Sequence, residues 1–392
     1  MKRRKKSEFK ARITNNKWSI IILCAAAVIF VVLCCICRTP KDSAIQDADY
    51  AEYETGKVVS ILSDSTWQDS DSDGAYRGEQ ALVVEVTSGQ YEGEQLLADN
   101  AIGPLYGIPL DVGDGVVLLI STYSDGDVRA TVHEYNRETA IIIVVLLFML
   151  TTVLVGGKTG AKSLISLIIT VACIFCILIP LLLKGFPTLL TVFITCAYVA
   201  VVSFVILGGV SKKTVCAICG TIAGIALALL FGLFAQSIAR IDGLRVSDVE
   251  PLLQLRQTGT PIGLRGLLVG GIIISALGAV MDVAMSLSSA MYEIKEVDSS
   301  IGRKALFKSG MNIGRDMVGT MTNTLILAFI GSSFVLIIYL YSLGLQPHLL
   351  FSSAFLAIEV ISGVASSIGV ILSVPITALI SSIILTKAEK AC

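Results

Sequence analysis

Long apolar runs limit what this sequence can fold into more than any other feature. A hydrocarbon core of ~30 Å is crossed by about 20 mostly apolar helical residues, and the chain contains about eight runs near that length. Only 16% of its residues are charged and its mean hydropathy is +0.79, whereas a soluble chain carries about 25% charged residues. We therefore expect an all-α polytopic membrane bundle of about eight transmembrane helices, at residues 18–37, 139–155, 163–183, 187–209, 214–235, 266–292, 317–342 and 349–386.

The first run has two possible interpretations. A basic segment at 2–6 precedes it, as in a signal peptide, but the run at 18–37 is too long for the apolar region of one and no small-x-small cleavage site follows. A lipoprotein site is also disfavoured, because Leu33 stands before Cys34 where a small residue is needed. Residues 1–37 are therefore expected to form a basic cytoplasmic N-terminus and a retained anchor.

Lys and Arg near helix ends predict the orientation, because cytoplasmic loops are enriched in them. With the N-terminus in the cytoplasm, most of the 30 basic residues fall inside. The exception is the outer loop before residue 266, which carries Arg240, Arg245, Arg256 and Arg265. The last run, 349–386, exceeds one upright span, so an interfacial or kinked stretch is expected before a span broken near Pro375. Seven or nine spans stay open as alternatives.

The polar segment 38–138 is expected to be a small extracytoplasmic β-rich domain inserted after the first helix. β-branched residues cluster at 57–62, 81–86, 116–121 and 128–134 between turn signals such as Asp-Gly. Short strands at this density favour a barrel or sandwich, OB-like. The segment contains no cysteine, so no disulfide framework is expected there. Residues 139–392 would then form the multi-helix transmembrane domain.

An acidic stretch in this domain resembles half of a calcium loop. Asp69, Asp71 and Asp73, followed by Gly74, match the start of the EF-hand pattern. The bidentate Glu expected at the twelfth position is Gln80, and the stretch lies between predicted strands instead of helices. We interpret it as a solvated acidic hairpin tip, with calcium as the weaker alternative.

Two carboxylates, Asp282 and Glu359, fall deep inside apolar runs, where ionisable groups are costly and usually functional. Residues at +4, +7 and +11 from Asp282 share its helical face, which we expect to point into the bundle, and Gly271 and Gly278 would permit close helix approach there. The alternative is that the hydroxyl groups only connect helices by hydrogen bonds. The candidate proton or substrate pathway comprises Asp282, Ser286, Ser289, Glu293, Thr320, Asn323 and Glu359.

The segments 278–293 and 359–378, which contain these carboxylates, resemble the YibE/F family of bacterial membrane proteins. The layout agrees along nearly the whole chain: a basic N-terminus, a single anchor, a β-rich outer domain and a helical bundle. The resemblance implies a multi-pass protein of the bacterial cytoplasmic membrane. It also implies a homo- or hetero-oligomer with a second YibE/F-type protein, since members come in longer and shorter forms, but it implies no particular activity.

The C-terminal bundle is also similar, more faintly, to SecF of the resistance–nodulation–division superfamily. The likeness rests on a helix with an Asp, a basic segment at Arg303 and Lys304, and a helix with Thr320 and Thr324. It implies a proton-responsive bundle. This chain departs from SecF by about two extra helices and a small outer domain.

Two functions compete on this evidence. One is a transporter or export-assisting permease, proton-coupled through Asp282, which has no cation at its depth. The other is a non-transporting membrane scaffold whose outer domain binds a partner protein. We expect no enzyme and no cofactor, because HExxH and GxSxG are absent and the chain has only two histidines. A net charge of −1 argues against nucleic acid, which leaves the lipid bilayer as the expected surroundings.

Overall fold

A computed structural model describes residues 21, 24–28, 30–33, 51–122, 128–241, 244, 249–257, 259–344 and 346–386. The chain divides into two compact units, Lys41–Val155 and Met1–Pro40 with Gly156–Cys392. Half of the predicted anchor, residues 18–37, lies outside the described residues, so its extent as a span stays a prediction.

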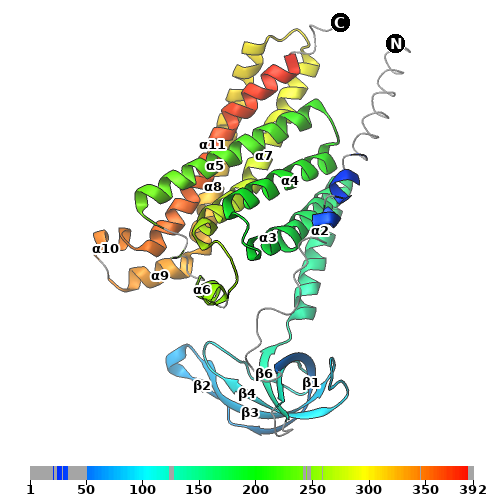
Figure 1. Cartoon of the computed structure of the whole chain (residues 1–392), viewed down its shortest axis with the longest axis vertical. Helices are drawn as coiled ribbons and strands as arrows, with labels where there is room; N and C mark the ends of the chain where they lie inside the picture. Colours follow the sequence, from blue (N-terminus) through cyan, green and yellow to red (C-terminus); the bar gives the residue numbers. More distant parts are fainter. Residues whose placement is uncertain are drawn as a thin grey trace. The chain divides into compact units, whose positions relative to one another are not determined.

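The first unit contains a closed β-barrel (Figure 1). β1 pairs with both β5 and β3, and the ring closes through β6 and β4, with β2 added beside β3. All pairs are antiparallel except β4 with β6. This arrangement agrees with the predicted OB-like barrel and not with a sandwich. The strands are β1 (Ala51–Asp64), β2 (Trp67–Asp69), β3 (Ala75–Val86), β4 (Gln95–Ile102), β5 (Gly115–Thr122) and β6 (Val128–Tyr135).

Closure of the barrel depends on β1, which forms hydrogen-bonded pairs with β5 and with β3. Gly56 pairs with Val116 on one side and Val86 on the other, and a Cβ at this position would lie 2.6 Å from Val84 Cγ1. Register shifts further along β1 bend the strand toward β3. Inward residues of the barrel strands then form one apolar core, which includes Leu82, Val84 and Leu118.

All four predicted strands are confirmed, and β2 and β4 were missed. Strand β4 shows why. Its sequence includes Asn100, a polar residue that the barrel buries completely. The Asn100 amide donates to Gln80 Oε1 and to the Ile108 carbonyl, both at 3.0 Å. These partners lie 20 and 8 residues away on other segments of the barrel, so alternation within β4 could not show that an Asn would face inward.

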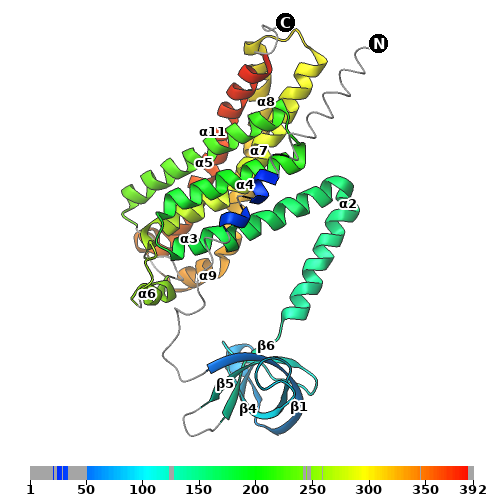
Figure 2. The same ribbon diagram turned by 45° about the vertical axis from the view of Figure 1, so that its right-hand side comes forward.

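The second unit is a helical bundle in which α5, α7 and α11 pack together, α8 lies along α11, and α4 contacts α5 and α7 (Figures 1 and 2). The helices, with the π-helix η2 (Ile174–Leu178), are α2 (Glu138–Cys173), α3 (Ile179–Leu183), α4 (Thr188–Gly208), α5 (Lys212–Ala239), α6 (Glu250–Gln257), α7 (Leu267–Val297), α8 (Arg303–Ser332), α9 (Phe334–Ser342), α10 (Pro347–Phe351) and α11 (Ala354–Thr386).

Among the described residues, five helical segments are long and apolar enough to cross a membrane, or six if the bent pair α8–α9 is one span. The predicted runs 139–155 and 163–183 lie in one helical stretch, Glu138–Leu183, which consists of two helices joined across a kink. It contains a non-helical residue, Gly157, with φ 53° and ψ −133°. The count of about eight therefore stays a prediction.

The expected break near Pro375 is wrong, because α11 continues through that residue. A proline removes one helical hydrogen bond, and packing on both sides of Pro375 offsets that loss. A Cβ on Gly314 of α8 would meet Val374 Cγ1 at 2.2 Å, and one on Gly220 of α5 would meet Thr377 Oγ1 at 2.1 Å. The short helix α10 lies where an interfacial stretch is expected, and its place relative to the membrane stays a prediction.

Close helix approach occurs at other glycines than those the sequence suggested. A Cβ on Gly224 of α5 would lie 2.6 Å from Val280 Cγ1 and 2.8 Å from Ser373 Cβ. Around Gly271 and Gly278 nothing described lies within 4 Å of that position. The expectation that these two glycines permit close approach is therefore wrong.

Candidate functional site

Asp282 lies on the wall of a hollow of about 340 Å³ between α2, α4 and α7. On α7, Ile274 and Leu277 line the hollow, and Asp282 lines it about two helical turns after Ile274. Among the described residues that line this hollow, none is Lys or Arg. The carboxylate therefore has no countercharge in the hollow that it borders.

Hydroxyl groups supply the rest of the polar lining. On α2 they recur at spacings of three and four residues, which place them on one helical face, and on α4 they are two turns apart. Thr170 donates its hydroxyl to the Ser166 carbonyl of its own helix, at 2.9 Å. A carboxylate on a hydroxyl-lined wall can bind a proton or a small cation with little competition from fixed charge. The hydroxyl residues are Ser163, Ser166, Thr170, Thr195 and Ser203.

The residues predicted to share the Asp282 face do not join this lining. Ser286 and Glu293 are exposed and Ser289 is half-buried. Asp282 itself is exposed in the described structure, contrary to the expectation that it points into the bundle. The reason is that α7 packs its opposite face, which includes Val280 and Leu287, into the core with α5 and α11.

Glu359, in contrast, is half-buried and borders two hollows. One, of about 180 Å³, lies against α8 and α9, and the other, of about 420 Å³, lies against α7. Phe329 lines both. Neither hollow includes Asp282, so the structure places the two carboxylates at different sites.

Ser275 and Ser366 connect the two polar stripes that contain these carboxylates. Their side-chain oxygens lie 2.9 Å apart, and Ser275 also donates to the Ile272 carbonyl at 3.0 Å. Ser275 lines the larger of the hollows at Glu359. The pair therefore joins α7 to α11 at the edge of the Glu359 site, by the kind of interhelical hydrogen bond that membrane bundles use.

Thr320 and Asn323 are not brought to either carboxylate. Both are exposed on α8, and the Thr320 hydroxyl donates to the Met317 carbonyl of the same helix at 3.0 Å. Neither residue lines the hollows that Asp282 and Glu359 border. Their place in a common pathway stays a prediction.

Comparison with known families decides what kind of protein carries these hollows. A family model described as YibE/F-like protein matches residues 144–387, more than half of the 392 residues. The chain belongs to the YibE/F-like family. No curated protein and no solved structure matches it, and the likeness to SecF gains no support.

The YibE/F match covers both carboxylates and every helix from α4 to α11, but it does not include the barrel strands β1–β6. Apolar helices of this length in a YibE/F-like chain make it a membrane protein. The hollows at Asp282 and Glu359 therefore belong to the part of the chain that the family match covers.

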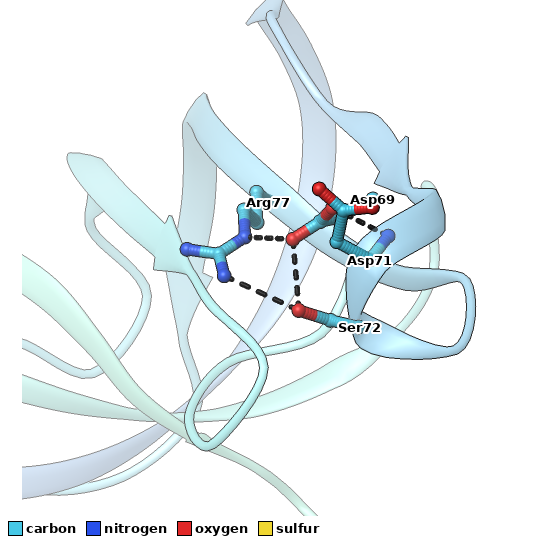
Figure 3. Close-up of polar contacts among 4 residues, drawn as sticks. All are labelled: Asp69, Asp71, Ser72 and Arg77. Carbon is cyan, nitrogen blue, oxygen red and sulfur yellow. Dashed lines mark hydrogen bonds and ion pairs between the residues drawn. The ribbon is translucent and has the colours of Figure 1, made fainter.

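The acidic stretch of the barrel forms a compact turn (Figure 3). Its short 3-10 helix η1 (Ser70–Ser72) begins after Asp69, whose carboxylate accepts hydrogen bonds from the Asp71 amide, the Ser72 hydroxyl and Arg77 Nε. These bonds hold the pKa of the Asp69 carboxyl below its ordinary value, chiefly through Ser72 and then Arg77. Among the described residues no group of three or more His, Cys, Asp or Glu is placed to hold a metal ion. Asp73 closes the turn with φ 55°.

Sequence reasoning missed the hydroxyl residues on α2 and α4. A polar stripe in an apolar run was the signal that could have shown them, namely the helical spacing of Ser163, Ser166 and Thr170. Nothing local paired that stripe with α4 or with Asp282, since the three elements are separated by up to 119 positions from Ser163 to Asp282.

Proposed function

We propose that this protein is a multi-pass permease, either a transporter or an export-assisting protein, in which proton binding at Asp282 is coupled to a rearrangement of the bundle. The observation that carries the proposal is the hollow between α2, α4 and α7, whose lining among the described residues includes one carboxylate, five hydroxyl residues and no Lys or Arg. Ionisable groups inside membrane spans usually mark ion or substrate pathways.

Buried hydroxyl groups without partners add support. Thr221 on α5, Ser288 on α7 and Thr377 on α11 are fully buried, and their side-chain oxygens have no hydrogen-bond partner among the described residues. Leaving such a group unsatisfied costs about 1–3 kcal/mol. These positions therefore favour entry of water or a second arrangement of the three central helices, and a permease needs one or both.

The proposal includes a topology. The N-terminus lies in the cytoplasm, the barrel lies outside the bacterial cytoplasmic membrane, and about eight helices cross it. The excess of Lys and Arg in the loops assigned to the inside supports this orientation. A second YibE/F-type protein is the partner that family membership suggests, as a homo- or hetero-oligomer.

The test is a set of three variants in a strain that lacks the gene. Asp282→Asn retains the shape and removes the charge change, Asp282→Glu retains the charge, and Glu293→Gln removes a carboxylate of the same helix outside the hollow. We expect Asp282→Asn to reach normal membrane abundance and thermal stability yet fail to complement, while the other two variants complement. If Asp282→Asn complemented as well as wild type, proton binding at Asp282 would not be needed for function and the proposal would be wrong.

A scaffold remains the second candidate because of the barrel surface. Trp67 and Tyr76 on the β2–β3 hairpin are 54% and 41% exposed, and Leu105 is 96% exposed. Exposed aromatic and large apolar side chains are enriched at protein interfaces. If Trp67→Ala with Tyr76→Ala abolishes complementation while Asp282→Asn preserves it, the scaffold is the better account.

A further inference from the structure

Another hollow of the bundle lies away from both carboxylates. It has a volume of about 710 Å³ and is formed where α4 and α7 begin, with α6 on one side. Figures 1 and 2 both place α6 at the end of the bundle where α3 ends. If α4 and α7 cross the membrane, as their length and composition allow, the hollow lies at the level of the lipid headgroups.

Two arginines give this hollow its charge. Arg256 and Arg265 line it, and its described lining contains no Asp or Glu. Arg256 donates from Nη1 to the Ile262 carbonyl at 3.1 Å, which orients the guanidinium and leaves its other N–H groups available. Both residues are exposed, and neither makes an ion pair with another described residue.

The remaining lining is mostly apolar. Leu189 of α4, Leu253 of α6 and Leu264 contribute walls on three sides. The α4 wall is the first turn of a long helix, whose free amide groups also favour an anion. Arginine forms bidentate hydrogen bonds with phosphate. In a phospholipid the glycerol and the upper acyl carbons adjoin the phosphate, and apolar walls can contact them.

The arginines also explain an irregularity of the sequence. Arg256 and Arg265 belong to the group of four arginines in a loop assigned to the outside, where the orientation rule disfavours them. A ligand that requires positive charge at that position would account for their presence.

We propose that this hollow binds the phosphate group of an anionic phospholipid, held by Arg256 and Arg265 with its glycerol backbone against Leu189, Leu253 and Leu264. The site is independent of the function proposed for Asp282. A lipid bound there would couple the α5–α7 connection to the first turns of two spans.

The experiment measures thermal unfolding of the purified full chain in detergent, titrated with phosphatidylglycerol, phosphatidylcholine or inorganic phosphate. A ligand that binds only the folded protein raises the melting temperature. We expect a saturable rise with phosphatidylglycerol alone. The double variant Arg256→Gln/Arg265→Gln should weaken the apparent affinity at least about tenfold, as expected for losing charge-assisted hydrogen bonds, and Arg303→Gln, an exposed arginine at the start of α8, should not.

The proposal would be overturned if phosphatidylglycerol and phosphatidylcholine raised the melting temperature equally. It would also be overturned if phosphatidylglycerol raised the melting temperatures of wild type and the double variant equally and with the same apparent affinity. An equal rise with inorganic phosphate would show that the hollow takes a free phosphate and not a lipid. If the double variant does not fold, the single variants Arg265→Gln and Arg265→Lys replace it. Lysine retains the charge but cannot form bidentate hydrogen bonds. The apparent affinity of Arg265→Lys for phosphatidylglycerol should therefore lie between those of wild type and Arg265→Gln.

Discussion

Ser275 of α7 and Ser366 of α11 form a hydrogen bond of 2.9 Å between their side-chain oxygens, 91 residues apart in the chain. Ser366 is completely buried and Ser275 borders the hollow at Glu359. The bond therefore ties the helix of Asp282 to the helix of Glu359, although the two carboxylates border separate hollows.

This bond predicts a coupling energy between the two helices. We expect Ser275→Ala and Ser366→Ala each to lower the free energy of unfolding, and the double variant to lose less than the sum of the two, by about 0.6 kcal/mol, the average for interhelical hydrogen bonds in membranes. Denaturant unfolding in detergent measures the cycle. Strictly additive losses would show that the pair contributes nothing beyond its separate contacts.

The helix contact at Gly224 predicts a clear difference between two glycines. Gly224→Ala should lower the free energy of unfolding by about 1–3 kcal/mol, as overpacked cores do, because its Cβ would collide with Val280 and Ser373. Gly271→Ala is the matched control in a neighbouring helix. It should be neutral or slightly stabilising, since nothing described lies near that Cβ and alanine favours helix. Equal losses would contradict the packing of α5 against α7 and α11.

The proposed topology predicts the labelling of two new cysteines. In a background without reactive native thiols, Asp71→Cys in the barrel and Lys212→Cys at the start of α5, both exposed positions, are treated with an impermeant maleimide on intact cells. We expect labelling at 71 and none at 212 until the cells are opened. The reverse pattern would invert the orientation.

The turn at Asp69 predicts a loss of barrel stability in acid. Because hydrogen bonds from Ser72 and Arg77 lower the pKa of Asp69 from its ordinary value of 3.8, the carboxylate stabilises the fold above that value. This contribution declines as the pH falls through the lower folded-state value. The fluorescence of Trp67, read in a Trp18→Phe background, reports unfolding of the barrel.

We expect Asp69→Asn to remove this pH dependence and Asp71→Asn, whose side chain lies on the exposed side of the turn, to preserve it. The same assay tests calcium. Millimolar Ca²⁺ should leave the transition unchanged, because the Asp69 carboxylate is already bonded to Ser72 and Arg77. A rise in the melting temperature that Asp71→Ala abolishes would instead support the calcium loop.

Local patterns predicted the long apolar helices and four of the strands, but not β2, β4 or α6. Apolar length predicted the helices, as at 214–235 in α5, and alternation predicted strands such as 116–121 in β5, because each signal depends only on residues within a few turns or pleats. The positions of Asp282 and Glu359 within long apolar helices followed in the same way. The family resemblance, read from residues 278–293 and 359–378, was confirmed over 144–387.

Tertiary structure alone decided which face of each helix is buried. A helix that is apolar on every side has no polar stripe to mark its outer surface. Helical spacing therefore grouped Asp282 with Ser286 and Glu293 on one face of α7. It could not show that this face lies opposite the contacts of α7 with α5 and α11. The approach of α5 to α11 depends on where Gly220 and Thr377 meet, 157 positions apart. Burial of Asn100 and closure of the barrel by β1 likewise depend on partners distant in the chain, and that is why only the folded structure reveals them.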